Sequence, residues 1–304
     1  MTIRPLSKLE TGAHIRIVGP ASAVHQDKIE AARRALESRG YEVSYGEHLF
    51  ERWTSHLALA GEDRDRAADV MQALTDPAVD MVLMGRGGYG TMRLLPYLDA
   101  RVLECVEPKP VVGFSDITAL HSYLAQVGWP TIHGPNAHSN LMGETLDSLC
   151  DLLEGRTREI SSDPLEPLNE FVREPVVAPW HGGNLAIIAS LVGTPYQPLW
   201  DGAVLYFEEV HEAPYRIDRM MNQLLLSGLL HPVRGLVFGE VVFDTGPDAD
   251  AVKAIVCEVA GRIGIPAWWG IQSGHSEPMF SLPLGLPLEI SAQGRVRMGD
   301  GVQG

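Results

Sequence analysis

Short apolar runs alternate with helix-like segments through the first half of the chain, and this alternation constrains the fold more than any other feature. Five segments have the length and apolar character of strands: His14–Val18, Tyr41–Tyr45, Val79–Met84, Pro110–Gly113 and Pro130–Ile132. Three segments between them carry apolar residues at helical spacing: Asp27–Arg39, Asp63–Leu74 and Ile117–Val127. Continuous apolar runs are typical of parallel strands that are covered on both faces. The pattern therefore predicts an α/β fold, with a parallel sheet and helices on both of its sides.

The pattern changes after residue 138, and a chain of 304 residues is long for a single core. A leucine-rich helix near residues 146–153 precedes a stretch, residues 156–179, that contains four prolines. We predict an N-terminal parallel-sheet α/β domain over residues 1–138, a helix and proline-rich linker over 139–179, and a C-terminal domain over 180–304. The C-terminal domain is predicted to be mixed α/β and rich in strands. Its expected elements are strands Ala203–Phe207, Leu236–Val242 and Leu286–Ser291, and helices near 184–192, 214–227 and 248–262.

Charge and cysteine content argue against several classes of partner. The 24 Lys and Arg residues are outnumbered by 39 Asp and Glu, a formal charge of −15, and the basic residues form no cluster. We therefore expect no nucleic-acid or anionic-membrane partner. Three widely spaced cysteines fit neither a disulfide framework nor a zinc site. The first residues lack the apolar core of a signal peptide, and the longest apolar stretch, Leu185–Val192, is less than half a membrane span. We expect a cytoplasmic protein.

The segment Val111–Thr118 places a serine where an apolar strand stops and a helix begins. A serine in this place is commonly a helix cap that accepts a bond from an unpaired backbone N–H group. It can also be a nucleophile presented at the carboxyl end of a parallel strand, where the helix N-terminus stabilises negative charge. The Gly-x-Ser-x-Gly motif is absent, because Ile117 stands at its last position. Local sequence leaves both interpretations of Ser115 open.

The turn Gly85–Gly90 matches Gly-x-Gly-x-x-Gly and lies between a predicted strand and a helix, so dinucleotide binding has to be considered. The turn follows roughly the third strand, whereas such turns normally follow the first. Glu104 has about the spacing of the expected acidic residue, but no predicted strand ends there. A glycine-rich turn can equally offer backbone N–H groups to an oxyanion.

Two separate residues complete the parts for nucleophilic acyl transfer. Glu208 follows the predicted strand Ala203–Phe207, where a carboxylate is commonly solvated. His275 lies in a loop of small residues, where a histidine is commonly incidental. Ser115, Glu208 and His275 would act together only if the fold brings them within hydrogen-bond reach.

A metal site is the competing use of the acidic segment. It would draw on Glu208, Glu209, His211 and Glu212. The segment lacks the His-Glu-x-x-His motif, and Pro214 prevents a continuous helix from pairing ligands at i and i+4. We expect no metal.

Seven short motifs in one order resemble the LD-carboxypeptidases, a family of serine peptidases that includes microcin C immunity peptidases. The resemblance covers nearly the full length, and the ordered set is much more specific than any one motif. The motifs are Gly19–Ser22, Arg86–Gly90 with Arg93–Pro96, Gly113–Thr118, His133–Pro135, Gly182–Leu185, Glu208 with Glu212–Arg219, and Ser273–His275.

The resemblance implies a role for five residues and a two-domain site. Ser115 would be the nucleophile, His275 the general base and Glu208 the residue that orients His275. The backbone N–H groups of Gly88 and Asp116 would form the oxyanion hole. The family architecture implies a flavodoxin-like N-terminal α/β domain and a mixed C-terminal domain, so the site should lie at their interface.

The resemblance also suggests where substrate binds, and it leaves two departures from the family pattern. Arg86, Trp180 and Asn184 are candidates for pocket walls. Glu209 stands where the family commonly has Asp, and His211 stands where Gly or Asn is common. Neither belongs to the expected triad, but His211 could alter substrate preference.

By this resemblance we expect the protein to remove the terminal D-alanine from murein tetrapeptides during peptidoglycan recycling, without a cofactor and as a homodimer. Two alternatives stay open. One is a related amidase that cleaves a peptidyl-nucleotide antibiotic, and the other is a peptide-binding protein that kept the fold without turnover.

Overall fold

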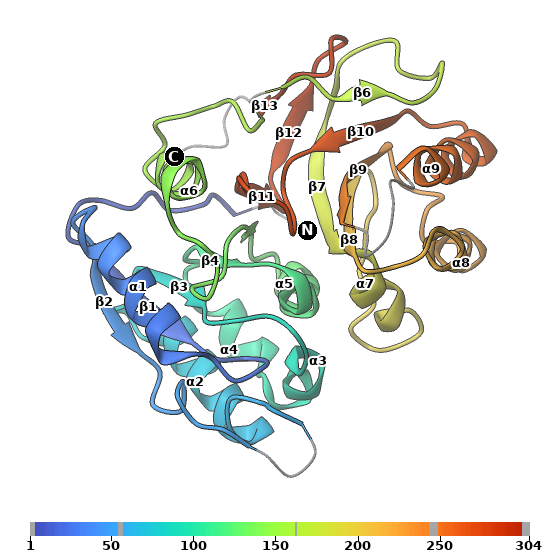
Figure 1. The fold of residues 1–304 in the computed structure, drawn as a ribbon. Helices are drawn as coiled ribbons and strands as arrows, with labels where there is room; N and C mark the ends of the chain where they lie inside the picture. The colour runs from blue at the N-terminus through green and yellow to red at the C-terminus, as the bar shows by residue number, and fades with distance from the viewer. Residues whose placement is uncertain (1–3, 54–56, 162, 243–248, 300–304) are drawn as a thin grey trace.

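Two β-sheets form the framework of the chain (Figure 1). The computed structural model describes residues 4–53, 57–161, 163–242 and 249–299. Strands of the first sheet lie in the order β11-β5-β4-β3-β1-β2. Their bounds are β1 (His14–Val18), β2 (Glu42–Tyr45), β3 (Met81–Met84), β4 (Val111–Gly113), β5 (Thr131–His133) and β11 (Leu282–Leu284). Strands β1 to β5 pair in parallel, as the sequence predicts, whereas β11 is antiparallel to β5.

Helices cover both faces of the first sheet. Successive strand residues point to opposite sides, so the apolar strands present side chains to the helices on each face. Ile15 and Ile17 share a core with the apolar stripe of α1, represented by Ile29, and with α6. Val82 and Met84 pack on the opposite face with α2 and α5. The helices of this half are α1 (Gln26–Glu37), α2 (Asp63–Thr75), α3 (Thr91–Leu94), α4 (Ala100–Glu104), α5 (Thr118–Gln126) and α6 (Gly143–Leu153), with short 3₁₀ turns η1 (Leu95–Tyr97) and η2 (Ser115–Ile117).

The second sheet is mixed and has the order β13-β12-β7-β8-β9-β10-β6. Its strands are β6 (Glu166–Pro167), β7 (Val176–Asn184), β8 (Val204–Val210), β9 (Gly235–Val242), β10 (Ala267–Ile271), β12 (Pro287–Ile290) and β13 (Val296–Met298). Strands β7 to β10 run parallel, and the others are antiparallel to their neighbours. The helices that follow β7, β8 and β9 are α7 (Leu185–Leu191), α8 (Pro214–Leu226) and α9 (Ala249–Ile263).

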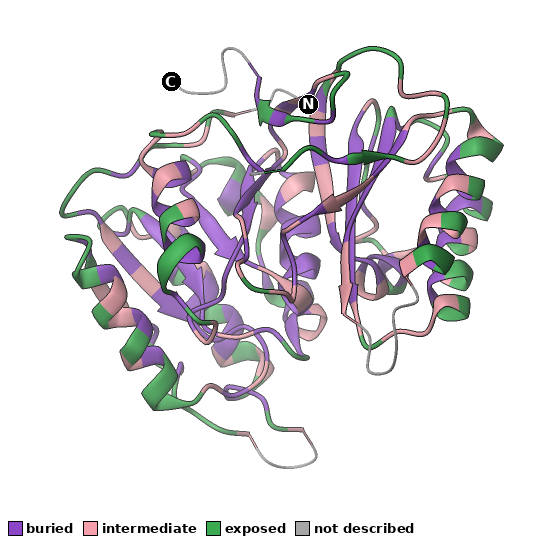
Figure 2. Cartoon of the chain, turned by 45° about the horizontal axis from the view of Figure 1, so that its top comes forward, coloured by how far each residue is buried: buried purple, intermediate pink, exposed green. Residues whose placement is uncertain are grey.

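The two faces of strand β8 serve different cores. Leu205 and Phe207 pack with α7, α8 and α9 on the outer face of the sheet. Val204 and Tyr206 point the other way, into the core that also holds Ile15 of the first sheet. The inner strands of both sheets are buried, and the outward sides of the helices are exposed (Figure 2). Both halves of the chain therefore share one apolar core. Among the described helices, none combines the length and apolar character needed to cross a bilayer.

Three of the differences between the structure and the predicted elements concern β7, β8 and β11. Strand β7 begins at Val176, inside the segment expected to be a linker, and Pro179 within it stands opposite Pro287, the first residue of β12. A proline cannot donate a backbone hydrogen bond to a neighbouring strand, so the four prolines in residues 156–179 suggested a linker. Pro179 is tolerated within β7 because it faces the terminal residue of β12. Strand β8 continues past Phe207 to Val210. The C-terminal region also supplies β11 to the first sheet. Asp248, the first residue of one predicted helix, lies outside the described residues.

Candidate active site

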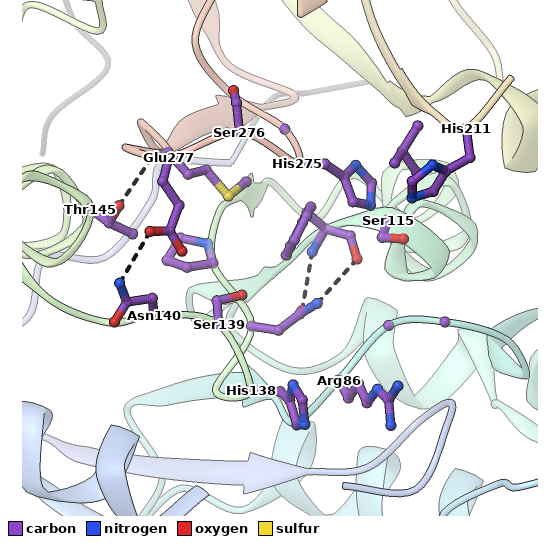
Figure 3. A pocket seen from close by; sticks show the side chains of 18 residues that line it. Arg86, Ser115, His138, Ser139, Asn140, Thr145, His211, His275, Ser276 and Glu277 are labelled. Atoms are coloured by element: carbon purple, nitrogen blue, oxygen red, sulfur yellow. Dashed lines mark hydrogen bonds between the residues drawn. The ribbon is translucent and has the colours of Figure 1, made fainter. Parts of the chain in front are cut away.

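A cavity of about 640 Å³ lies where the two halves of the chain meet (Figure 3). Its walls come from five segments that are distant in sequence. They are the glycine-rich turn at 86–88, the turn at 114–115, residues 135–145, the end of β8 at 210–211, and the loop 274–279. Ser115, Gly88 and His275 all contribute to this lining. The carboxyl ends of β3 and β4 open into it, which is where parallel sheets commonly place ligands.

Ser115 is held in a backbone conformation that serines rarely adopt. Its φ is 64°, in the left-handed region. The residue is the first of η2, whose cap is Phe114, and no side-chain bond caps either η2 or α5. The helix-cap interpretation of Ser115 is therefore wrong. The strained turn instead presents the hydroxyl to the cavity, as in the strand-to-helix turns that carry nucleophiles.

Two buried side chains hold the turn before Ser115. The Phe114 N–H donates to Asn136 Oδ1 at 3.2 Å, and His121 Nε2 donates to the Gly113 carbonyl at 2.8 Å. His121 is fully buried, and burial lowers its pKa to about 4, so the ring is neutral at pH 7. Sequence analysis missed both residues, because neither belongs to a motif with a recognisable chemical role.

The glycine-rich turn approaches the Ser115 turn closely. A Cβ added to Gly87 would lie 3.1 Å from Ser115 Cβ and 3.4 Å from the Asp116 backbone nitrogen. Gly88 has a φ of 92°, and a Cβ there would collide with Ser22 Oγ at 2.5 Å. The Gly88 and Asp116 segments are therefore neighbours, as an oxyanion hole would require.

Polar contacts anchor the glycine-rich turn on both sides. Ser22 Oγ accepts a hydrogen bond from the Tyr89 N–H at 3.1 Å, and buried Arg66 donates to the carbonyls of Pro20 and Gly90. The Asp116 carboxylate accepts from the Thr91 N–H at 2.8 Å. Ser22 belongs to a motif noted in the sequence, but Arg66 gave no local signal.

Glu208 and His275 form a direct pair. His275 Nδ1 and Glu208 Oε2 are 2.6 Å apart, and Glu208 is fully buried. Burial acts to lower the pKa of His275, but the hydrogen bond and negative charge of Glu208 outweigh it, so the pKa of His275 is raised. Gly274 allows the approach, because a Cβ there would lie 3.0 Å from Glu208 Oε2. The ring of Phe114, next to Ser115, lies 4.9 Å from the His275 ring.

The alternative in which the carboxylate after Phe207 is solvated is wrong. Glu208 and Glu209 both lie within β8 and are buried. The pairing of β8 with β9 shifts register between Phe207 and Glu209, and such irregularities are common beside active sites. The Glu209 carboxylate accepts from Asn184 Nδ2 and from the N–H groups of Ala186 and Val210. Burial nevertheless raises the pKa of Glu209 to about 7.

The three candidates for substrate binding lie in different surroundings. Arg86 lines the cavity, and its Nη1 donates to the Ala23 carbonyl at 2.8 Å. Trp180 is fully buried in the shared core and does not line the cavity. Asn184 is buried too: its Oδ1 caps α7 through the Ile187 N–H, and its amide bonds Glu209. The structure therefore brings Arg86, but neither Trp180 nor Asn184, to the cavity wall.

The acidic segment shows no metal-binding arrangement. Within the described ranges, no group of three or more His, Cys, Asp or Glu side chains is placed to hold a metal ion. The Glu209 oxygens are engaged by three donors, and α8 begins only at Pro214, so Glu212 lies outside the helix.

Comparison with known proteins identifies the family. The LD-carboxypeptidase N-terminal domain matches residues 15–134, and the LD-carboxypeptidase C-terminal domain matches residues 178–290. The chain belongs to the LD-carboxypeptidase family. A murein tetrapeptide carboxypeptidase from Pseudomonas aeruginosa is 31% identical over 304 residues, which cover 94% of this chain and 96% of the relative.

Solved structures of LD-carboxypeptidase relatives share the fold. A muramoyltetrapeptide carboxypeptidase from Oxalobacter formigenes is 30% identical, with a TM-score of 0.79 over 95% of this chain and 99% of that one. The microcin C7 self-immunity protein MccF superposes with a TM-score of 0.87 at 19% identity, over 99% of both chains. The two-sheet α/β architecture is thus the family architecture, and the chain, as a member of this family, is a peptide hydrolase.

Proposed function

We propose that this protein is a serine-type LD-carboxypeptidase that releases the terminal D-alanine from murein tetrapeptides. One observation carries the proposal: a buried Glu208–His275 pair opens into the same cavity as a serine in a strained turn. A carboxylate that orients a histidine beside a serine is the arrangement of nucleophilic acyl transfer. The substrate class is supported by the similarity to relatives named for murein peptides.

The proposed mechanism assigns one task to each group. Ser115 Oγ attacks the carbonyl of the residue before D-alanine, and His275 accepts the hydroxyl proton. The N–H groups of Gly88 and Asp116 stabilise the oxyanion that forms. His275 then gives its proton to the departing amine of D-alanine, which leaves an acyl-enzyme. Water, deprotonated by His275, hydrolyses the ester and restores Ser115.

Glu208 acts through His275 and does not touch the substrate. Its hydrogen bond to Nδ1 fixes the tautomer that leaves Nε2 free to accept the proton, and its charge stabilises the imidazolium that follows. The pair also explains the raised pKa of His275, since the positive ring is favoured beside a buried anion. We further propose that the enzyme works in the cytoplasm as a homodimer, in peptidoglycan recycling.

Incubation with L-Ala-D-Glu-diaminopimelate-D-Ala tests the function, with mass spectrometry to detect loss of alanine. We expect release of D-alanine by the parent enzyme and a loss of at least about 10³-fold in kcat for Ser115→Ala. The control is Ser190→Ala on the exposed side of α7, which should keep parental activity. Equal rates for the parent and Ser115→Ala would contradict the nucleophile assignment. Cleavage of a peptidyl nucleotide in preference to the tetrapeptide would contradict the substrate class.

A further inference from the structure

Two non-glycine residues have a positive φ in the described part of the chain, and both line the same cavity. They are Ser115, with a φ of 64°, and His211, with a φ of 60°. Strained backbone of this kind persists only where the surroundings impose it, and it clusters at functional sites. Ser115 has a role in the proposed mechanism, whereas His211 does not.

His211 is held at the cavity by the second sheet. It follows Val210, the last residue of β8, and its N–H donates to the Val242 carbonyl at the end of β9 at 2.8 Å. The residue therefore sits three positions after Glu208, at the end of the strand that supplies the buried carboxylate. Glycine or asparagine would occupy this conformation with less strain, so the backbone does not require an imidazole here.

Imidazole and guanidinium groups outnumber carboxylates in the cavity lining, although the whole chain has a formal charge of −15. Arg86, His138, His211 and His275 line it, and Glu277 is the one acidic residue among the lining residues. In Figure 3, Ser115 lies between His211 and Arg86, and Glu277 lies toward the opposite side of the cavity. In this view the imidazole of His211 and the guanidinium of Arg86 lie on opposite sides of Ser115, and both groups can donate to an anion.

We propose that His211 is a specificity-determining residue that binds, together with Arg86, the free carboxylate of the departing C-terminal residue. The inference rests on the proposed function, in which a single Cα separates that carboxylate from the nitrogen of the cleaved bond. The carboxylate therefore has to lie beside Ser115. Imidazole and guanidinium N–H groups are suitable donors to it. Recognition of this group would restrict cleavage to the last residue of a peptide.

Binding to an inactive enzyme tests the role of His211 without turnover. The probes are L-Ala-D-Glu-diaminopimelate-D-Ala and the same peptide ending in D-alaninamide, and the proteins are Ser115→Ala and the double variant Ser115→Ala/His211→Asn. Calorimetry should show tighter binding of the free acid to Ser115→Ala. The His211→Asn change should weaken that binding about tenfold, the loss expected for one hydrogen bond to a charged group, and leave the amide unchanged.

Kinetics and thermal unfolding distinguish this role from a structural one. In the otherwise native enzyme, His211→Asn and His211→Gly should raise KM for the free acid and leave kcat and the thermal midpoint at or above their parental values. Equal affinities of Ser115→Ala for acid and amide, binding of neither, or an equal loss on both peptides would overturn the inference. Absence of turnover by the parent enzyme would instead contradict the proposed function, because the calorimetry decides the role of His211 independently.

Discussion

At the scale of single residues, the proposed chemistry depends on a charge removed from water. Glu208 is fully buried, so its attraction for the imidazolium form of His275 is little screened. The raised pKa of His275 is the measurable consequence. His275 accepts a proton only when it is neutral, so kcat/KM should fall as the pH drops through this raised pKa.

The change Glu208→Gln should separate the charge from the hydrogen bond. Without the buried anion the pKa of His275 falls, so the acidic limb of the kcat/KM profile should move to lower pH. The maximal rate should drop by roughly 10²–10⁴-fold, because the imidazolium loses its counter-charge. The measurement is kcat/KM for the tetrapeptide from about pH 5 to about pH 9. A limb that stays in place would show that Glu208 does not set the pKa of His275.

Sequence alone placed the candidate residues but not the contacts that hold them. The resemblance to LD-carboxypeptidases pointed to Ser115, Glu208 and His275, and the structure brings all three to one cavity, with Glu208 behind its wall. Asn136 and Arg66 support the two turns through bonds to backbone groups. Such bonds leave no periodic pattern, because any buried polar side chain of suitable length can make them.

At the scale of elements, the close approach of β7 and β8 depends on glycine. Gly182 pairs with Tyr206 and has a φ of 137°, and a Cβ there would lie 1.7 Å from the Tyr206 carbonyl oxygen. Backbone atoms cannot yield as a flexible side chain does. The Gly-Gly-Asn-Leu motif at 182–185 contributes to the family resemblance, and its first glycine is also required for the packing of β7 against β8.

We expect Gly182→Ala to lower the free energy of unfolding by about 3 kcal/mol or more, because the two strands must separate to admit a methyl group. The matched control is Gly264→Ala, which also has a positive φ, 70°, but has no atom within 4 Å of the added Cβ. That change should cost about 1 kcal/mol. Urea unfolding of both variants provides the comparison. Similar losses in the free energy of unfolding for the two variants would show that the backbone conformation, and not the contact with Tyr206, restricts position 182 to glycine.

Elements with a strong apolar pattern were predicted within a few residues, and those with mixed signals were not. Helix α2 and strand β4 match their expected ranges closely. Strand β7 was not predicted, because prolines predict a break and the identity of the neighbouring strand is invisible in sequence. Strand β8 was cut short at Phe207, because two glutamates look solvated until their partners are known. The partners, not the local propensity, decided both cases.

At the scale of the whole molecule, one core joins the two sheets. Residues of β1, β4, β8 and β12 belong to a single apolar cluster, and β11 carries the C-terminal region into the first sheet. The division into domains at 1–138 and 180–304 stays a prediction. Because the shared apolar core continues from one sheet to the other without a break, we expect the two halves of the chain to unfold together.

Urea unfolding should therefore show one cooperative transition. Far-UV circular dichroism and tryptophan fluorescence should give coincident curves, since loss of either half exposes the core of the other. The parent enzyme and Leu282→Ala, which removes a fully buried side chain of β11, should both unfold in one step, the variant at lower urea. Two separated transitions in the parent would show that the halves are thermodynamically independent.

The return of β11 to the first sheet also bears on how the protein is made. A ribosome produces the chain from its amino end, so Ser115 emerges long before His275 and before the strand at 282–284 that borders β5. Under the proposed mechanism, a nascent chain that already displays its nucleophile has no base to activate it. Hydrolytic capacity would then arise only near the end of translation, and a message truncated ahead of codon 275 would yield a product inert toward cell-wall peptides.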